Sequence, residues 1–147
     1  MILYLDSSSL VKVYVEETHS DQVRRWLGDA AVVATSVVAY PEAAAAFARK
    51  VREGGLKSEA LDPVLAALAA DWFDYAVIEV SERAAGDLAI KHGLRGFDAI
   101  HLTAALELKA DARNVAVAFS SFDARLNKAA AGEGLAVLEP PGGLPGI

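Results

Sequence analysis

The chain has 147 residues, a length that suits one domain with a sizeable hydrophobic core. Hydrophobic residues make up 54% of it, which excludes an intrinsically disordered chain. Its apolar runs are all shorter than the ~18 residues of a membrane-spanning helix, so we expect no membrane segment. The formal net charge of −6 argues against broad electrostatic attraction to nucleic acid.

The chain contains no cysteine, so disulfides and zinc sites built on thiolates are excluded. The opening residues MILYLDSSS lack the basic region and the cleavage site of a secretory signal. We therefore expect a cytoplasmic protein.

Short Val-rich apolar segments alternate with segments whose apolar residues recur every three or four positions. The first pattern predicts strands covered on both faces, and the second predicts helices. In chain order we expect a strand at 1–5, helices at 8–16 and 20–28, a strand at 31–35, helices at 37–53 and 58–74, a strand at 76–80, helices at 82–92 and 97–109, a strand at 115–119, a helix at 122–131 and a strand at 135–138. This alternation predicts an α/β fold, a three-layer α/β/α sandwich with a central, mostly parallel sheet. We expect a single domain over residues 1–138, followed by a Pro/Gly-rich tail at 139–147.

Two acidic residues follow predicted strands. Asp6 comes after the strand at 1–5, and we expect Ser7 or Ser8 to cap the helix that follows. Asp123 repeats the pattern, because a strand and two serines precede it and a helix begins beside it. The carboxyl ends of parallel strands lie at one edge of a sheet, where ligands bind, so we expect Asp6 and Asp123 at the same edge.

Two further acids lie at the predicted starts of helices. Asp98 is in LRGFDAIHLTAAL, and Glu42 is in TSVVAYPEAAAAF, where the helix begins either at Ser36 or near Pro41. Each acid taken alone is explained by the favourable interaction of a carboxylate with a helix N-terminus. Four carboxylates at one edge would repel one another unless cations lay between them, and ligands made only of oxygen suit Mg²⁺ or Mn²⁺.

The histidines do not form a zinc-binding pattern, since no HExxH or similar pair is present. His101 falls on the apolar stripe of the helix at 97–109, so we interpret it as a core histidine with a local hydrogen bond rather than as a catalytic base. We expect His19 and His92 at the surface or at helix ends.

The chain resembles the PIN domain, and within it the VapC-type toxins of toxin–antitoxin systems. The matching pieces are YLDSSSLVKVYVEE, Glu42 after TSVVAYP, LRGFDAIHLTAAL and FSSFDARLNKAA, which span residues 2 to about 138. The resemblance implies an endoribonuclease that hydrolyses RNA with Mg²⁺ or Mn²⁺, whose metal-binding and catalytic acids are Asp6, Glu42, Asp98 and Asp123. It also implies a homodimer and a cognate VapB-type antitoxin that holds the enzyme inactive.

Several residues beside the acids are candidates for supporting roles. Ser7 and Ser121 match hydroxyl residues of the family. Lys12, Arg95 and Arg125 stand near the acids in sequence, where they are either contacts to the RNA backbone or solvated surface charges. Bound metal ions would activate a water, neutralise the phosphoryl oxygens and stabilise the leaving oxygen. The number of ions, and the acid that takes the proton of the water, stay open.

Three other functions share some of these sequence features. An aspartyl phosphatase usually has a second acid two residues after the first, where this chain has Ser8. A receiver domain has paired acids after the first strand and a lysine after the last, whereas Asp6 stands alone and residues 139–142 are Glu-Pro-Pro-Gly. The remaining alternative is a catalytically silent PIN-like module that binds metal or RNA, and the intact set of acids argues against it.

Trp72, Phe73 and Tyr75 cluster near the end of the helix at 58–74. Aromatic clusters are enriched at protein interfaces, but these side chains could equally complete the core. The family resemblance favours the interface of a homodimer.

Overall fold

The structure is a computed structural model that describes residues 1–144. Its centre is a sheet of parallel strands, namely β1 (Ile2–Leu5), β2 (Val32–Ser36), β3 (Ala76–Ile78), β4 (Val117–Ser120) and β5 (Ala136–Leu138). The order across the sheet is β3-β2-β1-β4-β5. In the central register, Tyr4 of β1 pairs with Ala34 of β2 on one side and with Phe119 of β4 on the other. Every expected strand is present.

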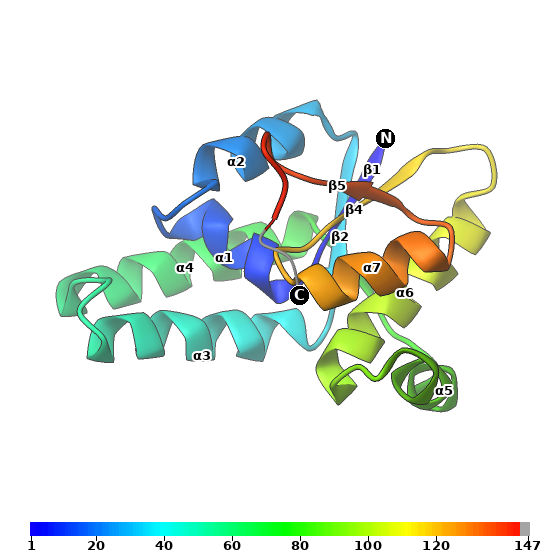
Figure 1. Cartoon of the computed structure of the whole chain (residues 1–147). Helices are drawn as coiled ribbons and strands as arrows, with labels where there is room; N and C mark the ends of the chain where they lie inside the picture. Colours follow the sequence, from blue (N-terminus) through cyan, green and yellow to red (C-terminus); the bar gives the residue numbers. More distant parts are fainter. Residues whose placement is uncertain (145–147) are drawn as a thin grey trace.

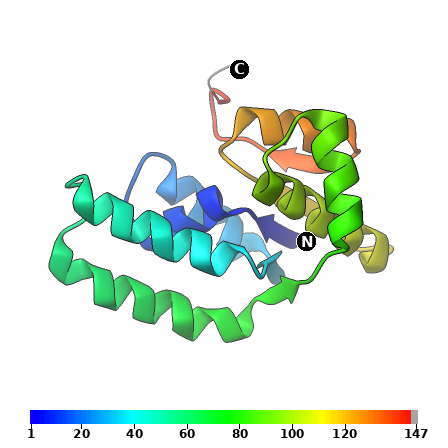
Figure 2. The same ribbon diagram turned by 90° about the horizontal axis from the view of Figure 1, so that it is seen from below.

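Helices cover both faces of this sheet, as Figures 1 and 2 show. The α-helices among residues 1–144 are α1 (Ser7–Tyr14), α2 (Ser20–Asp29), α3 (Ala39–Arg52), α4 (Leu61–Asp71), α5 (Glu82–His92), α6 (Gly96–Ala112) and α7 (Ala124–Gly132). Helices α1 to α4 lie on one face, and α5 to α7 lie on the other. The expected three-layer α/β/α sandwich with a parallel sheet is therefore confirmed.

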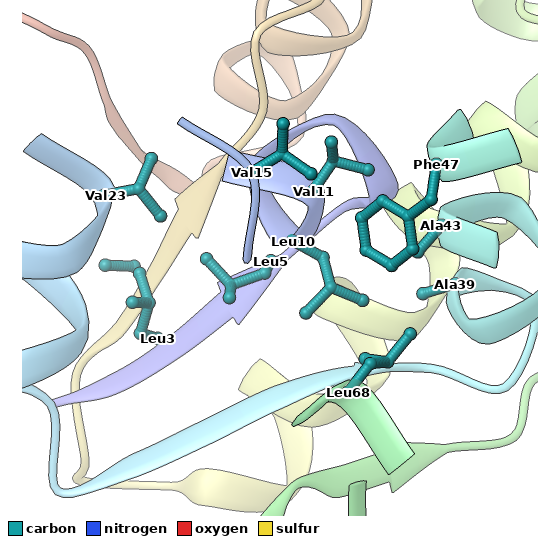
Figure 3. Close-up of a cluster of buried hydrophobic side chains, with 11 residues drawn as sticks. Leu3, Leu5, Leu10, Val11, Val15, Val23, Ala39, Ala43, Phe47 and Leu68 are labelled. Atoms are coloured by element: carbon teal, nitrogen blue, oxygen red, sulfur yellow. The ribbon is translucent and has the colours of Figure 1, made fainter. Parts of the chain in front are cut away.

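Successive residues of β1 enter different cores because side chains alternate along a strand. Leu3 and Leu5 are fully buried in the first core, where α1 contributes Leu10, α3 contributes Phe47 and α4 contributes Leu68. Figure 3 shows these side chains gathered between the strands and the helices. The near-continuous apolar pattern of β1 thus reflects a strand buried on both sides.

Tyr4 points into the second core, between the sheet and helices α6 and α7. Its ring stacks on Phe119 of β4, with ring centroids 5.6 Å apart and planes 8° apart. Leu102 of α6 and Leu126 of α7 are fully buried in the same core. This packing fixes the first turn of α6 and the start of α7 relative to the end of β1.

Two helix boundaries depend on proline. Helix α3 begins at Ala39, between the two starts that the sequence left open, so Pro41 lies in its first turn. Proline is tolerated there because backbone N–H groups of the first turn have no partner within the helix. The helix expected at 58–74 is divided into a 3₁₀ turn at Ser58–Ala60, α4, and a second 3₁₀ turn at Trp72–Asp74. Pro63 likewise lies in the first turn of α4.

The strand order reverses beside β1. After β1 the chain adds β2 and β3 on one side of it, and then β4 and β5 on the other. The carboxyl ends of β1 and β4 therefore flank the switch point at which open α/β sheets bind ligands. Asp6 directly follows β1, and Asp123 follows β4 at the start of α7.

The tail expected at 139–147 is described as far as Leu144, and residues 145–147 lie outside the described residues. Within the described part, Pro140 is buried, and the backbone N–H of Gly143 donates to its carbonyl at 2.9 Å. The division of the chain after residue 138 stays a prediction. None of the described helices has both the length and the hydropathy needed to cross a bilayer.

Candidate functional site

Asp6 is the N-cap of α1. Its Oδ1 accepts a hydrogen bond from the backbone N–H of Ser9 at 2.9 Å and another from the Ser8 hydroxyl at 2.7 Å. The expectation that Ser7 or Ser8 caps this helix is therefore wrong, because α1 begins at Ser7 and the acid itself occupies the cap position. Both bonds go to Oδ1, and no described residue donates to Oδ2. Asp6 thus keeps one oxygen for a ligand.

Asp123 repeats this geometry at the start of α7. Its Oδ1 accepts from the backbone N–H of Leu126 at 3.0 Å, as a cap does. Ser121 is 1% exposed, and its hydroxyl accepts from the backbone N–H of Asp123 at 3.0 Å. The contact of Ser121 is thus with the backbone of Asp123, which it holds in place.

A serine bridge joins the two capped acids. The Ser8 hydroxyl that donates to Asp6 accepts from the backbone N–H of Phe122 at 2.9 Å. Below it, the buried hydroxyls of Ser9 and Ser120 lie 2.8 Å apart. These contacts tie the end of β1 to the end of β4. Sequence reasoning treated Ser8 only as a possible cap, although the run of three serines after an acid is the signal that points to it.

Asp98 lies in the first turn of α6, and its side chain is 19% exposed. The Arg95 guanidinium reaches it at 3.4 Å and also lies 3.8 Å from Oδ2 of Asp123. Burial raises the pKa of Asp98, the nearby charge of Asp123 raises it further, and Arg95 counteracts this in part. Like charges therefore crowd this site, which is the condition under which a cation is favoured.

Glu42 lies in the first turn of α3, and its Oε1 is 2.8 Å from Nε2 of His101. His101 is 1% exposed, which confirms that it is a core residue, but the expectation of a local hydrogen bond is wrong. The bond joins residues 59 positions apart and ends on one of the four acids, which sequence reasoning did not anticipate. On the other side, Nδ1 of His101 is 2.8 Å from the hydroxyl of Tyr4.

Three of the four acids contribute to the pKa shifts of neighbouring groups. Burial raises the pKa of Tyr4, and the charges of Asp6 and Glu42 raise it further. The pKa of Asp98 responds in the same direction to Asp123 and Asp6. Asp6, which follows β1, thus affects groups on β1 and α6, while Glu42 of α3 affects Tyr4 and Asp123 affects Asp98.

Two cavities open on either side of Asp98. The larger, of about 780 Å³, is lined by Ser7, Ser8, Val11, Lys12, Glu17, Glu42, Ala45, Ala46, Arg49, Lys50, Arg95, Gly96, Phe97 and Asp98. The smaller, of about 330 Å³, is lined by Gly93, Leu94, Arg95, Asp98, Asp123 and Arg125. Arg95 and Asp98 belong to both linings, so the head of α6 separates them. Asp6 is 3% exposed and belongs to neither lining.

The chemistry of this donor set suits a hard divalent cation, because carboxylate oxygens are the ligands that Mg²⁺ and Mn²⁺ prefer. Glu42 and Asp98 face a cavity large enough for a hydrated ion. As the side chains of residues 1–144 stand, however, no three His, Asp or Glu groups form a cluster that could hold one ion. A shared ion would therefore require the acids to draw together.

Two of the candidate cations lie in different surroundings. Lys12 is 11% exposed, is 2.9 Å from Glu17, and lies over the ring of Phe122. Lys50 pairs with the same Glu17. Burial alone would raise the pKa of Glu17, but Lys50 and Lys12 outweigh it and lower that pKa. Lys12 is thus held in an ion cluster in the wall of the larger cavity, whereas Arg125 is exposed and lines the smaller one.

Comparisons with known proteins agree with this architecture. The model of the PIN domain matches residues 3–132. Ribonuclease VapC45 of Mycobacterium tuberculosis (strain CDC 1551 / Oshkosh) is 37% identical over 145 residues, which cover 92% of this chain and 94% of that protein.

Two solved structures share the fold. The crystal structure of FitAcB from Neisseria gonorrhoeae superposes with a TM-score of 0.64 at 17% identity, over 95% of this chain and 98% of that chain. The structure of Mycobacterium tuberculosis VapC20, a Sarcin-Ricin loop cleaving toxin, gives 0.64 at 16% identity, over 94% and 99%. At these identities the two structures bear on the fold alone. The family model and the 37% identity to a VapC protein together show that this chain belongs to the PIN-domain family, among its VapC members.

Proposed function

We propose that this chain is a metal-dependent endoribonuclease toxin that hydrolyses RNA phosphodiester bonds with Mg²⁺ or Mn²⁺. Its relative VapC45 is named a ribonuclease and aligns over almost the whole chain. The observation that supports the proposal is that Glu42 and Asp98 line the larger cavity while Asp98 and Asp123 line the smaller one, with the pKa of Asp98 raised by burial and by the charge of Asp123. A structural role alone does not account for this crowding.

Asp6, Glu42, Asp98 and Asp123 are the residues that would hold the ion or ions. When bound, the metal supplies charge neutralisation at the phosphoryl oxygens and lowers the pKa of a water. The caps of α1 and α7 fix Asp6 and Asp123 through their Oδ1 atoms, so the two carboxylates are oriented before a ligand arrives. Any of the acids that retains a free oxygen is a candidate to accept the proton of the attacking water.

Arg95 is suited to a phosphate of the substrate. Its side chain is 85% exposed, and its pairs with Asp98 and Asp123 are 3.4 and 3.8 Å long. Exposed ion pairs contribute little free energy, so the guanidinium exchanges one anion for another at small cost. With the acids neutralised by a cation, Arg95 would be free to contact the RNA backbone, and Arg125, which lines the smaller cavity, would serve the same task.

The larger cavity gives a single RNA strand a path to the acids. Its wall carries the exposed Arg49, and the 55% exposed ring of Phe97 lies directly before Asp98 in the chain. Unpaired bases stack on aromatic side chains while cations follow the phosphates. A strand whose base stacks on Phe97 would bring the adjoining phosphate to Asp98.

The proposal includes a cognate VapB-type antitoxin, self-association as a homodimer and a cytoplasmic location. A cleft with four carboxylates attracts a basic side chain as readily as it attracts a metal ion, so an antitoxin is expected to aim an Arg or Lys at it. For self-association, Phe73 offers an apolar contact, since it is 89% exposed. Trp72 and Tyr75 instead pack edge-on against each other, and Trp72 also packs against Tyr40.

An RNA cleavage assay tests the proposal. The full chain, incubated with Mn²⁺ and labelled single-stranded RNA of mixed sequence or total cellular RNA, is expected to produce discrete fragments. Asp6→Asn and Asp98→Asn, purified identically, are expected to lose at least 100-fold in rate, because each removes a ligand charge with almost no change in shape. Unchanged cleavage by both variants would contradict the site assignment.

The same assay separates the enzyme from a catalytically silent PIN-like module that binds metal or RNA. A silent module would bind Mn²⁺ and RNA but give no fragments at any metal concentration. The difference is read directly when binding and cleavage are measured on the same sample.

A further inference from the structure

Three polar side chains form one hydrogen-bonded chain from the second core to the acids. The hydroxyl of Tyr4 is 2.8 Å from Nδ1 of His101, and Nε2 of His101 is 2.8 Å from Oε1 of Glu42. Tyr4 is fully buried and His101 is 1% exposed, whereas the Glu42 side chain is 21% exposed and faces the larger cavity. The chain of bonds therefore begins in a dry core and ends at the candidate metal site.

The donors and acceptors fix the direction of this chain. An ionised carboxylate offers only acceptors, so Nε2 of His101 carries the proton that it donates to Glu42. Nδ1 of a neutral imidazole then has only a lone pair, and it accepts from the Tyr4 hydroxyl. Tyr4 thus selects the tautomer of His101 that can donate to Glu42.

The surroundings hold both donors rigidly. The Tyr4 ring stacks on Phe119, and the His101 ring meets it edge-on with centroids 5.9 Å apart. Such contacts restrict ring rotation in a close-packed core. The proton on Nε2 therefore has one position available to it, and Oε1 of Glu42 lies there.

Glu42 needs such an anchor more than the capped acids do. Asp6 and Asp123 are short, and each is held by a backbone N–H of its own helix. The Glu42 side chain has an additional rotatable bond, so fixing it in one orientation costs more rotamer freedom than fixing an aspartate does. No backbone N–H of the described residues donates to its carboxylate, so His101 supplies the hydrogen bond that a cap supplies elsewhere.

We propose that Tyr4 and His101 are positioning residues that hold Glu42 in the orientation required to bind the divalent cation. Tyr4 sets the tautomer of His101, and His101 ties Oε1 of Glu42 so that Oε2 is presented to the cavity. This inference rests on the proposed function, because it assigns Glu42 to the metal site. It adds to the four acids two buried residues that touch neither metal nor RNA.

Amide side chains separate the two hydrogen bonds of His101. In His101→Gln the amide nitrogen takes the place of Nε2 and can still donate to Glu42. In His101→Asn the shorter amide stays near the position of Nδ1, so the bond to Tyr4 can persist while the bond to Glu42 is lost. Tyr4→Phe removes only a hydroxyl and keeps the ring stack. Thr103→Val is the matched control, since Thr103 is a buried polar residue of α6 whose hydroxyl donates to the carbonyl of Ala99.

Mn²⁺ affinity of the full chain, measured by electron paramagnetic resonance of the free ion, is the main readout. His101→Asn is expected to weaken binding about 10–100-fold, the usual effect of losing an outer-shell partner. His101→Gln should retain most of the affinity, Tyr4→Phe should lose less than His101→Asn, and Thr103→Val should bind as the wild type does. A ¹⁵N NMR spectrum of the metal-free protein should show His101 protonated at Nε2.

The decisive comparison is made in a Glu42→Ala background, where His101→Asn should cost no further affinity because its route to the metal, the Glu42 carboxylate, is gone. An equal loss in both backgrounds, or His101→Asn that binds Mn²⁺ as the wild type does, would overturn the proposal. If His101→Asn does not fold, Tyr4→Phe decides: wild-type affinity together with an unchanged His101 tautomer would overturn it. If the wild-type protein binds Mn²⁺ through Asp98 but cuts no RNA, the proposed ribonuclease function is refuted and the positioning role of Tyr4 and His101 can still be tested. If the wild-type protein binds no Mn²⁺, both the proposed function and the positioning role are refuted.

Discussion

Asp6 and Asp123 are both helix caps and candidate metal ligands, so these two interpretations of an acid after a strand are not exclusive. Each uses Oδ1 for the backbone N–H of the residue three positions later, and Oδ2 takes no part in the cap. The N-terminus of a helix also stabilises negative charge. A cap therefore fixes the carboxylate and favours its ionised form, and both effects suit a ligand for a divalent cation.

Asp98→Asn is predicted to stabilise the metal-free protein slightly at neutral pH. The pKa of Asp98 is raised, chiefly by burial and then by Asp123, so the folded state favours the neutral carboxyl. Ionisation therefore costs stability as the pH rises through the raised pKa, and no cost remains below the ordinary pKa of the unfolded chain. Urea unfolding between pH 3 and 8, with EDTA present, should show the variant gaining on the wild type as the pH rises. Loss of the exposed Arg95 pair changes little. If the variant instead becomes less stable than the wild type as the pH rises, the raised pKa of Asp98 is contradicted.

Glu17 links two helices, α1 and α3, in the lining of the larger cavity. It lies after α1, and its carboxylate pairs with Lys12 of α1 and with Lys50 of α3. The three side chains are mostly buried, at 11% exposure for Lys12, 23% for Glu17 and 26% for Lys50. Removing the central acid would leave two lysines facing each other in a poorly solvated place.

Glu17→Gln is accordingly predicted to destabilise the protein by about 1–3 kcal/mol at pH 7. The pKa of Glu17 is lowered on balance, so its contribution is present above the unfolded pKa and is lost as the pH falls through the folded pKa. Guanidinium unfolding should therefore show a larger deficit at pH 7 than at pH 3. Glu16→Gln is the matched control, since Glu16 is 70% exposed and pairs only with Arg24 in the described part of the chain, so its loss should change little. Equal effects of the two substitutions would argue against the cluster.

The head of α6 carries an exposed aromatic ring beside an acid, which the cavity lining places on the proposed path of RNA. Phe97→Ala is predicted to weaken binding of single-stranded RNA about 5–160-fold, from a stacking energy of about 1–3 kcal/mol per base. Fluorescence anisotropy with a labelled oligonucleotide and the inactive Asp98→Asn background measures binding without cleavage. Ile90→Ala, an exposed apolar residue of α5 outside the cavity lining, should bind RNA as its parent does.

At the scale of the whole molecule, much of the fold follows from local sequence patterns. Alternation of Val-rich strands with helical periodicity specifies a parallel sheet, and it also specifies the edge at which Asp6 and Asp123 emerge. The helix expected at 58–74 is divided, and α4 starts only after Ala60. Both features depend on Pro63 and on tertiary packing. A pattern of apolar residues carries too little information to set such boundaries.

The candidate site is likewise predictable from the sequence only in part. Acids that follow strands are visible in sequence, whereas the partners that hold them lie far away in the chain. His101 is 59 residues from Glu42, and Ser8 is 114 residues from Phe122. Lys12 stands near Asp6 in sequence, yet its side chain turns to Glu17, which sequence proximity cannot reveal. Such pairings arise only when the elements pack together.

Phe73 is the candidate contact residue for the proposed homodimer. Phe73 is 89% exposed beside a packed aromatic cluster, and an exposed ring at this position is typical of an interface residue. Phe73→Glu is expected to convert a dimer into a monomer, because it places a charge in an apolar contact. Light scattering at micromolar concentrations measures the mass. Ile90→Glu changes an equally exposed residue of α5 and should leave the mass unchanged, and a wild-type chain that is monomeric throughout would contradict the homodimer.

The most direct test of the metal centre is a crystal structure of the full chain grown with Mn²⁺, with anomalous diffraction recorded at the manganese absorption edge. Anomalous scattering locates the ion independently of any assumption about its ligands. We predict a peak bounded by the carboxylates of Asp6, Glu42, Asp98 and Asp123, and the loss or marked weakening of that peak in Asp98→Asn. A peak elsewhere on the molecule, or no peak at millimolar Mn²⁺, would contradict the assignment of these four acids as a metal centre.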